Sequence, residues 1–169
     1  MYFGSKLDGQ TSMKLADRYL DAGGRFLDTA NIYASWIGAC MGGESETILG
    51  TWMRARGNRD QLFLATKMGF GYQDVPTSAS VKSVISECER SLQRLNTDYL
   101  DLLYIHADDP ATPCAETLGA LATLKEAGKI RYIGASNYKT ERLVMASEAA
   151  TAAGLEPYQC IQHRLTFLR

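Results

Sequence analysis

The segment FLDTANIY (26–33) carries an apolar run directly into a carboxylate, Asp28, and places a phenol, Tyr33, five positions later. A phenol has an ordinary pKa of about 10, which is too high for acid–base work near neutrality. A cation close to a phenol favours the phenolate, and a carboxylate paired with that cation holds it in place. The segment therefore predicts a proton-transfer site, provided that the fold brings a cation to the same place.

Four other apolar runs also end in a group that titrates or hydrogen-bonds. They are LFLAT, LLYI, RYIGA and QCI, and the residues at their ends are Lys67, His106, Ser136 with Asn137, and Gln162. Each of these residues alone is typical of a turn, a solvated strand end or a structural hydrogen bond. In parallel α/β folds, however, the C-terminal ends of the strands lie on one face, where such enzymes place their chemistry. Five such ends together predict a site.

A carboxylate, a phenol, a lysine and a histidine in one place suit protonation of a carbonyl oxygen while a hydride arrives at the carbon. That reaction needs a nicotinamide cofactor. The hydroxyl and amide groups of Ser136, Asn137 and Gln162 suit the carboxamide of such a cofactor. The chain has no GxGxxG fingerprint, because GGESETILG lacks the spacing.

Helical and strand patterns alternate along the chain. In the clearest helix, apolar residues from Val81 to Leu95 follow the 3.6-residue period. Helices are expected at 12–22, 45–56, 78–95, 115–127 and 140–153, and strands at 2–4, 25–29, 62–67, 99–106, 130–137 and 159–167. Glycines 23, 57, 128 and 154 follow the helical patterns. Alternating βα units predict a parallel sheet, either a doubly wound sheet or a (β/α)8 barrel, in a single domain spanning 1–169.

The bulk composition excludes several classes of protein. The chain is 46% hydrophobic and 22% charged, and its formal net charge is -1, so neither a nucleic acid nor a charged membrane surface is an expected partner. No run reaches the ~18 apolar residues of a spanning helix. The start, MYFGSKLDG, lacks the pattern of a secretory signal, and the four cysteines form no CxxC pair. These features predict a cytoplasmic protein with reduced thiols.

Several longer motifs occur in a fixed order: FLDTANIY with GGESETILG, LFLATKMG, SLQRLNTDYLDLLYIHADDP, LKEAGKIRYIGASNY and IQHRLTFLR. Through them the sequence resembles the aldo-keto reductases, NADPH-dependent oxidoreductases with a (β/α)8 (TIM) barrel. The resemblance implies reduction of aldehydes and ketones, with Tyr33 as proton donor, Lys67 and Asp28 as the pair that tunes it, and His106 orienting the carbonyl. It also implies that Ser136, Asn137 and Gln162 hold the nicotinamide. No metal is implied.

The sequence departs from the family pattern in three places. A TIM barrel typically needs roughly 250 residues, so we expect a barrel truncated after about strand 6, a fragment of a longer reductase. We expect the chain either to rearrange or to pair with a second chain, in a homo-oligomer, so that the open barrel edges are covered. The segment after Tyr33 is long, and its Trp36, Ile37 and Met41 either line an apolar pocket or pack as a surface loop. Leu165 replaces an aromatic residue that often stacks on the nicotinamide.

Other functions fit the same residues. A barrel that binds a nucleotide to regulate a partner would keep the whole set intact. A Schiff-base aldolase using Lys67 fits less well, because Tyr33 and Asn137 would then have no task. A metal hydrolase built on His106 and the two aspartates after it is the weakest reading, since the chain has only two histidines.

Overall fold

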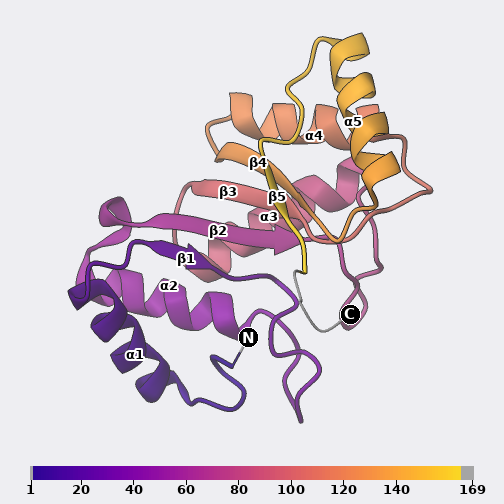
Figure 1. Cartoon of the computed structure of the whole chain (residues 1–169). Helices are drawn as coiled ribbons and strands as arrows, with labels where there is room; N and C mark the ends of the chain where they lie inside the picture. The colour runs from indigo at the N-terminus through magenta and orange to yellow at the C-terminus, as the bar shows by residue number, and fades with distance from the viewer. Residues whose placement is uncertain (1, 165–169) are drawn as a thin grey trace.

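A computed structural model describes residues 2–164, in which helices and strands alternate along the chain (Figure 1). The strands are β1 (Phe26–Asp28), β2 (Phe63–Met68), β3 (Leu100–Ile105), β4 (Ile130–Ser136) and β5 (Cys160–Gln162). The helices are α1 (Gly9–Asp21), α2 (Glu44–Arg56), α3 (Val81–Leu95), α4 (Cys114–Glu126) and α5 (Thr140–Ala153), and a 3-10 turn, Arg59–Gln61, precedes β2. None of the helices within residues 2–164 is long and apolar enough to cross a membrane.

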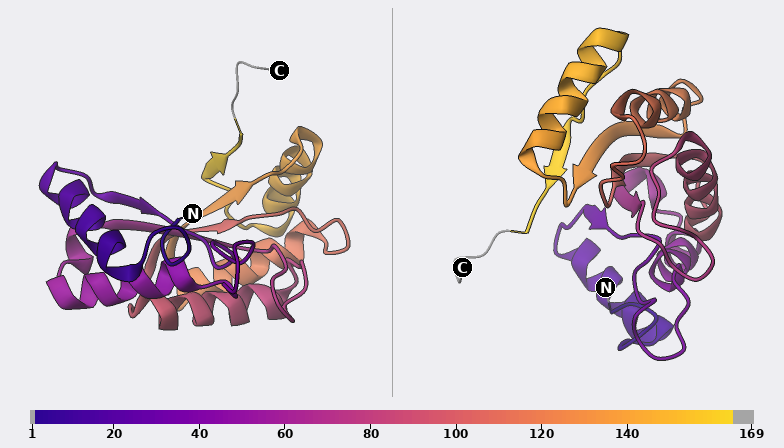
Figure 2. Two further views of the ribbon diagram at one scale, coloured as in Figure 1. Left: turned by 90° about the horizontal axis from the view of Figure 1, so that it is seen from below. Right: turned by 90° about the vertical axis from the view of Figure 1, so that its right-hand side faces the viewer.

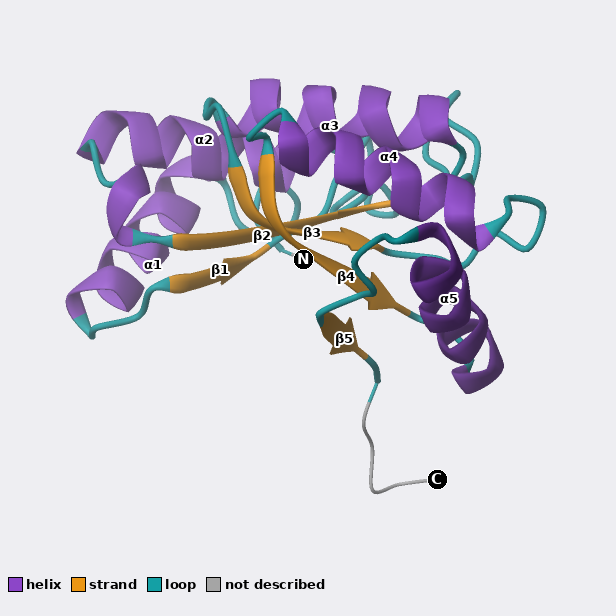
Figure 3. Cartoon of the chain, turned by 90° about the horizontal axis from the view of Figure 1, so that it is seen from above, coloured by secondary structure: helices purple, strands orange, loops and turns teal. Residues whose placement is uncertain are grey.

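The five strands form one parallel sheet in the order β1-β2-β3-β4-β5. The helices lie side by side along one face of this sheet, and no helix of the described chain covers the other face (Figures 2 and 3). A doubly wound sheet would carry helices on both faces and a reversal of strand order. Sequential order with one helical layer is the arrangement of a (β/α)8 barrel, and the structure is a curled part of one, as expected.

The curl of the sheet brings its two outer strands together at one end. The side-chain amide of Gln162, at the end of β5, donates to a carboxylate oxygen of Asp28, at the end of β1, over 3.2 Å. These two strands do not pair with each other through their backbones. The C-terminal ends of all five strands therefore surround one place.

The prediction of a strand at residues 2–4 is wrong. Residues 2–4 do not join the sheet, so the described chain has five strands instead of about six. The segment folds back on itself: Phe3 forms an isolated bridge with Leu7, and Gly4 takes a φ of 78°, which an extended strand does not use. The backbone groups of this segment bond within their own turn, since Gly4 donates to Leu7 and Leu7 donates to Tyr2, so they do not pair with the sheet. The last strand covers only 160–162, and the part of its expected range from residue 165 onward lies outside the described residues.

The main core lies between the helices and the sheet. Large side chains from α2, α3 and the strands are fully buried there, among them Trp52, Leu64, Leu95, Leu103 and Ile105. Alternate strand residues point to the concave face and form a smaller cluster of Ala65, Leu102 and Tyr104. Further along that face, aromatic rings stack in a row from β1 to β4, and the outer two, Phe26 and Tyr132, are 46% and 47% exposed.

The helix ends follow the local signals of the sequence. The Ser80 side chain accepts a hydrogen bond from the Ser83 amide and starts α3, three residues later than the expected boundary. The Asp8 carboxylate accepts from the Thr11 amide in the same way, so α1 begins before the expected residue 12. Gly57 and Gly154 close α2 and α5 with left-handed backbones, as predicted. These caps set where α1 and α3 begin and where α2 and α5 end.

Candidate active site

The ammonium of Lys67 is the centre of the candidate site. Lys67 is the second-to-last residue of β2, and its side chain has no exposed surface. Its Nζ lies 2.7 and 2.8 Å from the two carboxylate oxygens of Asp28, which is the last residue of the neighbouring strand. It also donates to the backbone carbonyl of Thr29 over 2.9 Å. A buried cation is costly unless it is paired and hydrogen-bonded, and these contacts meet both conditions.

The third partner of Lys67 is the phenol of Tyr33, whose oxygen accepts a hydrogen bond from Nζ over 2.9 Å. The ammonium also lies 4.7 Å from the centre of the Tyr33 ring. The phenol hydroxyl donates to no side chain or carbonyl within residues 2–164, so its proton remains available to a ligand. The structure thus brings Asp28, Lys67 and Tyr33 together, with the Lys67 ammonium between the carboxylate and the phenol.

His106 lies directly after β3 and faces the same place. The edge of the Tyr33 ring meets the imidazole at 5.9 Å between centroids, and Phe70 meets it at 4.9 Å. His106 is 8% exposed, and its Nδ1 is buried without a partner among the described residues. Burial, together with the nearby Lys67 charge, lowers the pKa of His106 to about 4. The imidazole is therefore neutral near pH 7 and can hydrogen-bond to a ligand.

The three residues expected at a carboxamide lie beside this group. Asn137 adopts a left-handed backbone with a φ of 58°, and its Nδ2 donates to the His106 carbonyl over 2.8 Å and to the Ser136 hydroxyl over 3.1 Å. Ser136 is buried, and Gln162 donates to Asp28. These bonds use the amide nitrogens, so the side-chain oxygens of Asn137 and Gln162 can accept from a carboxamide, to which the Ser136 hydroxyl can donate. The donor set fits a nicotinamide.

The sequence that forms this incomplete parallel barrel matches a known family. The family model described as "Aldo/keto reductase family" matches residues 1–169. The chain belongs to the aldo/keto reductase family. Within residues 2–164, no three His, Cys, Asp or Glu side chains gather in a group that could hold a metal ion.

The relatives of this aldo/keto reductase chain include named oxidoreductases. It is 36% identical to norsolorinic acid reductase of Aspergillus flavus over 163 residues, which covers 92% of the chain and 40% of that protein. It is 34% identical to aryl-alcohol dehydrogenase [NADP(+)] of Phanerodontia chrysosporium, over 90% of the chain and 40% of that protein. It is 36% identical to the aldo-keto reductase YhdN of Bacillus subtilis, over 89% and 44%. The chain thus spans about two fifths of the length of these relatives.

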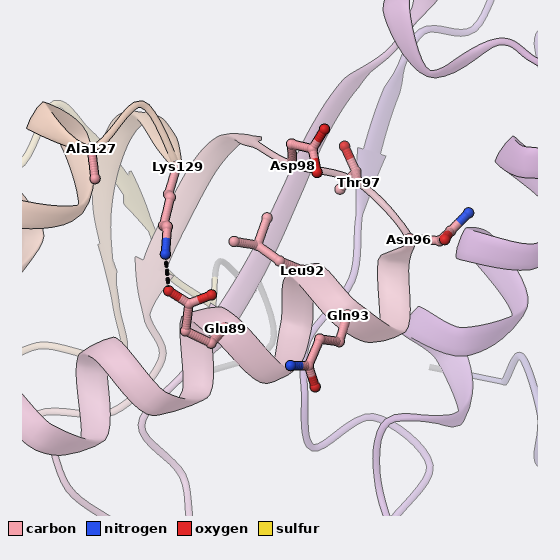
Figure 4. Close-up of a pocket in the computed structure, with 8 residues that line it drawn as sticks. All are labelled: Glu89, Leu92, Gln93, Asn96, Thr97, Asp98, Ala127 and Lys129. Atoms are coloured by element: carbon pink, nitrogen blue, oxygen red, sulfur yellow. Dashed lines mark hydrogen bonds and ion pairs between the residues drawn. The ribbon is translucent and has the colours of Figure 1, made fainter.

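A separate pocket lies near the N-terminal ends of β3 and β4. It measures roughly 720 Å³ and lies between the C-terminal half of α3, residues 96–98 and the start of β4 (Figure 4). Most of the side chains around it are polar or charged, and Lys129 pairs with Glu89 across it. None of the expected site residues lines it. Strand N-termini in barrel enzymes serve stability rather than chemistry, so the strand C-terminal ends carry the candidate site.

Sequence reasoning missed two residues beside the site, Phe70 and Tyr104. Phe70 packs against His106, and Trp36 meets the edge of Tyr33 at 6.1 Å while remaining 53% exposed. Trp36, one of the three apolar loop residues, thus contacts a residue of the candidate site. Below Lys67, the Tyr104 hydroxyl lies 3.0 Å from the Cys160 sulfur, and burial raises the pKa of the Tyr104 phenol. A tyrosine within an apolar strand gave no separate signal.

Proposed function

We propose that the protein to which this chain belongs reduces aldehydes and ketones to alcohols with NADPH. The observation that carries the proposal is the buried Lys67 ammonium, which contacts the Asp28 carboxylate and the Tyr33 oxygen at the same time. The printed names of the relatives, a reductase and an NADP(+) dehydrogenase among them, agree with this chemistry and cofactor. NADPH, when bound, supplies the hydride.

The residues of the chain then supply the proton and the orientation. Tyr33 donates its hydroxyl proton to the carbonyl oxygen, and Lys67, whose ammonium donates to the same phenol oxygen, stabilises the phenolate that remains. Asp28 keeps the ammonium in place and balances its charge. The neutral His106 hydrogen-bonds to the carbonyl oxygen and fixes its direction.

The cofactor would lie against the C-terminal ends of β4 and β5. Ser136, Asn137 and Gln162 would hold the carboxamide through the free hydroxyl and amide oxygens described above. Because Gln162 also donates to Asp28, the carboxamide and the proton donor would be held in one connected set of hydrogen bonds. This arrangement would keep the ring and the carbonyl group within reach of each other.

The contacts of Lys67 weigh against a Schiff-base aldolase. An amine attacks a carbonyl only in its neutral form, usually after its charge has been made unfavourable. Lys67 instead lies in a close ion pair and uses its donors on Asp28, Thr29 and Tyr33. Borohydride trapping of a carbonyl substrate followed by mass spectrometry should give no adduct on Lys67.

The test of the proposed reduction is the variant Tyr33→Phe, which removes the hydroxyl and keeps the ring. General acid catalysis contributes about 10²–10⁴-fold, so turnover of an aldehyde should fall by that factor. Cofactor binding, followed by the fluorescence of bound NADPH, should be unchanged because Tyr33 is not among its expected ligands. Unchanged turnover would remove Tyr33 from the mechanism. Cofactor binding without turnover in the unmodified protein would favour the regulatory barrel instead.

A further inference from the structure

Asn31 lies between Asp28 and Tyr33 but faces the opposite layer of the fold. Its backbone N–H donates to the Lys67 carbonyl over 3.0 Å, which continues the pairing of β1 with β2. Its side chain is fully buried, and its Nδ2 donates over 2.8 Å to a carboxylate oxygen of Glu87 on α3. The segment that carries the phenol is therefore attached to the helical layer as well as to the sheet.

Glu87 is a charged residue on the buried side of its helix, only 2% exposed. The oxygen that accepts from Asn31 also accepts from the Tyr72 hydroxyl over 2.7 Å, and the other oxygen pairs with Arg90 at 2.9 Å. A buried carboxylate is tolerated only when it is hydrogen-bonded in this way. The Asn31 Oδ1 has no partner within residues 2–164, so Glu87 alone holds that side chain.

A second arm of the same buried network reaches the strand that carries Lys67. Arg94 lies 3.5 Å from the Tyr72 hydroxyl and donates to Glu46 over 2.6 Å. Glu46 is fully buried in α2 and accepts from the Thr66 hydroxyl over 2.6 Å. Thr66 immediately precedes Lys67. Side chains of α2 and α3 thus bind the chain next to both partners of the ammonium–phenol contact.

We infer that Glu87 is a positioning residue, which acts through Asn31 to hold Tyr33 against Lys67 from the helical side of the sheet. Its catalytic consequence rests on the proposed function, but its structural consequence does not. Asp28 and Tyr33 are separated by four residues outside regular structure, and such a segment keeps a side chain in place only where its own backbone is fixed. The Asn31–Glu87 bond adds to the backbone pairing with β2 and fixes the segment from the helical side.

The test is the variant Glu87→Gln, with Glu89→Gln as its matched control on the same helix. Glutamine has the shape of glutamate, but Asn31, Tyr72 and Arg90 all donate to the carboxylate, so the amide nitrogen must face a donor. Glu89 instead pairs with Lys129 at the protein surface. Hydrogen exchange of single amides, followed by nuclear magnetic resonance, reports on the N–H groups of Asn31 and Tyr33 without any need for turnover.

In Glu87→Gln, these two amides should exchange roughly tenfold faster or more, the effect of losing a hydrogen bond to a charged group. They should be unchanged in Glu89→Gln, and the amides of Leu103 and Ile105 in β3 should be unchanged in both variants. Unchanged exchange at Asn31 and Tyr33 would overturn the inference, and so would equal acceleration in β3, which would indicate general destabilisation.

If Glu87→Gln does not fold, Asn31→Ala removes the same hydrogen bond by changing its donor. Exchange at the Tyr33 amide should then be faster, while the amides of Leu103 and Ile105 stay unchanged. Slow exchange at Tyr33 in that variant would overturn the inference. In the active protein, kcat should fall about tenfold in Glu87→Gln while KM for the carbonyl stays within about twofold, as expected when only the placement of a catalytic group changes. A change in KM with an unchanged kcat would contradict a positioning role. If the proposed function is wrong, no turnover can be measured, but the hydrogen-exchange result still tests the positioning of Tyr33.

Discussion

Acidification should destabilise the fold through His106, because its imidazole is buried where a positive charge is costly. Burial and the Lys67 ammonium lower its pKa from 6.5 to about 4. The unfolded chain therefore binds a proton at a pH where the folded chain does not, and stability rises with pH across this window. The contribution of His106 is complete above about pH 6.5 and is lost as the pH falls toward 4. Each unit is worth about 1.4 kcal/mol, so the loss amounts to about 3 kcal/mol.

The assay is urea unfolding at a series of pH values between about 7.5 and 4 for the unmodified chain and for His106→Gln. Carboxylates that are paired in the fold also lose stability in acid, but they do so in both proteins. The difference in unfolding free energy between the two proteins should therefore shrink by about 3 kcal/mol across the range. His163→Gln is the matched control, since His163 is exposed and is the only other histidine of the chain.

A difference that stays constant with pH would refute the reasoning. Nuclear magnetic resonance of the imidazole provides an independent check, because the signal of His106 should change with a midpoint near pH 4. A midpoint near 6.5 would mean that the ring is hydrated in the folded protein. The loss of a neutral imidazole in acid would then not explain any fall in stability.

Three further predictions concern the Asp28–Lys67 ion pair, the loop residue Trp36 and the concave face of the sheet. Asp28→Asn leaves the buried Lys67 without its counter-charge and should lower the free energy of unfolding in urea by about 3 kcal/mol. This value is near the lower limit for breaking a buried pair, because Asp28 is 30% exposed. A loss of unfolding free energy below about 1 kcal/mol would contradict a buried pair. Trp36→Ala should raise KM for an aromatic aldehyde about tenfold and leave KM for a small aliphatic aldehyde unchanged, because the exposed indole borders Tyr33. Equal effects on both KM values would exclude a role of Trp36 in binding aromatic substrates. The half-exposed Phe26 and Tyr132 lie on a face that no helix within residues 2–164 covers, so the 18.6 kDa chain should sediment as a dimer or larger. A monomer that binds no apolar-surface dye would refute this prediction.

The residues at the strand ends could be predicted from the sequence because parallel pairing fixes where they go. Asp28 pairs in register with Ala65, and side chains alternate along a strand, so Lys67 faces the same side as Asp28. The order of the strands could not be derived in this way. Alternating βα units fit both a doubly wound sheet and a barrel, and only the resemblance to a family separated them. Residues 2–4 misled because a short apolar run before a glycine looks like a strand until its own turn is considered.

The buried network behind the site could have been suspected from one signal. Glu87 lies three residues after Val84 and four before Ser91, on the buried side of α3, where a carboxylate needs a partner. The sequence does not say which partner, because Asn31 is 56 positions away and meets Glu87 only when α3 packs behind β1 and β2. Helical periodicity predicts that a residue is buried, whereas the identity of its neighbour depends on the packing of two layers.

These two kinds of constraint divide the segment between β1 and α2 into parts with different tolerance to change. Up to Tyr33 it is fixed from both sides: Thr29 and Asn31 donate through their backbones to β2, Lys67 binds from the concave face, and Glu87 binds from the helical layer. Beyond Tyr33 the segment is held mainly near its end, where Glu44 accepts from the amides at 41 and 42. Insertions between Trp36 and Cys40 should therefore reshape the mouth of the site, whereas an insertion before Tyr33 would move the phenol away from the ammonium. Variation in substrate preference is accordingly expected in the later part, and loss of the Lys67–Tyr33 contact in the earlier one.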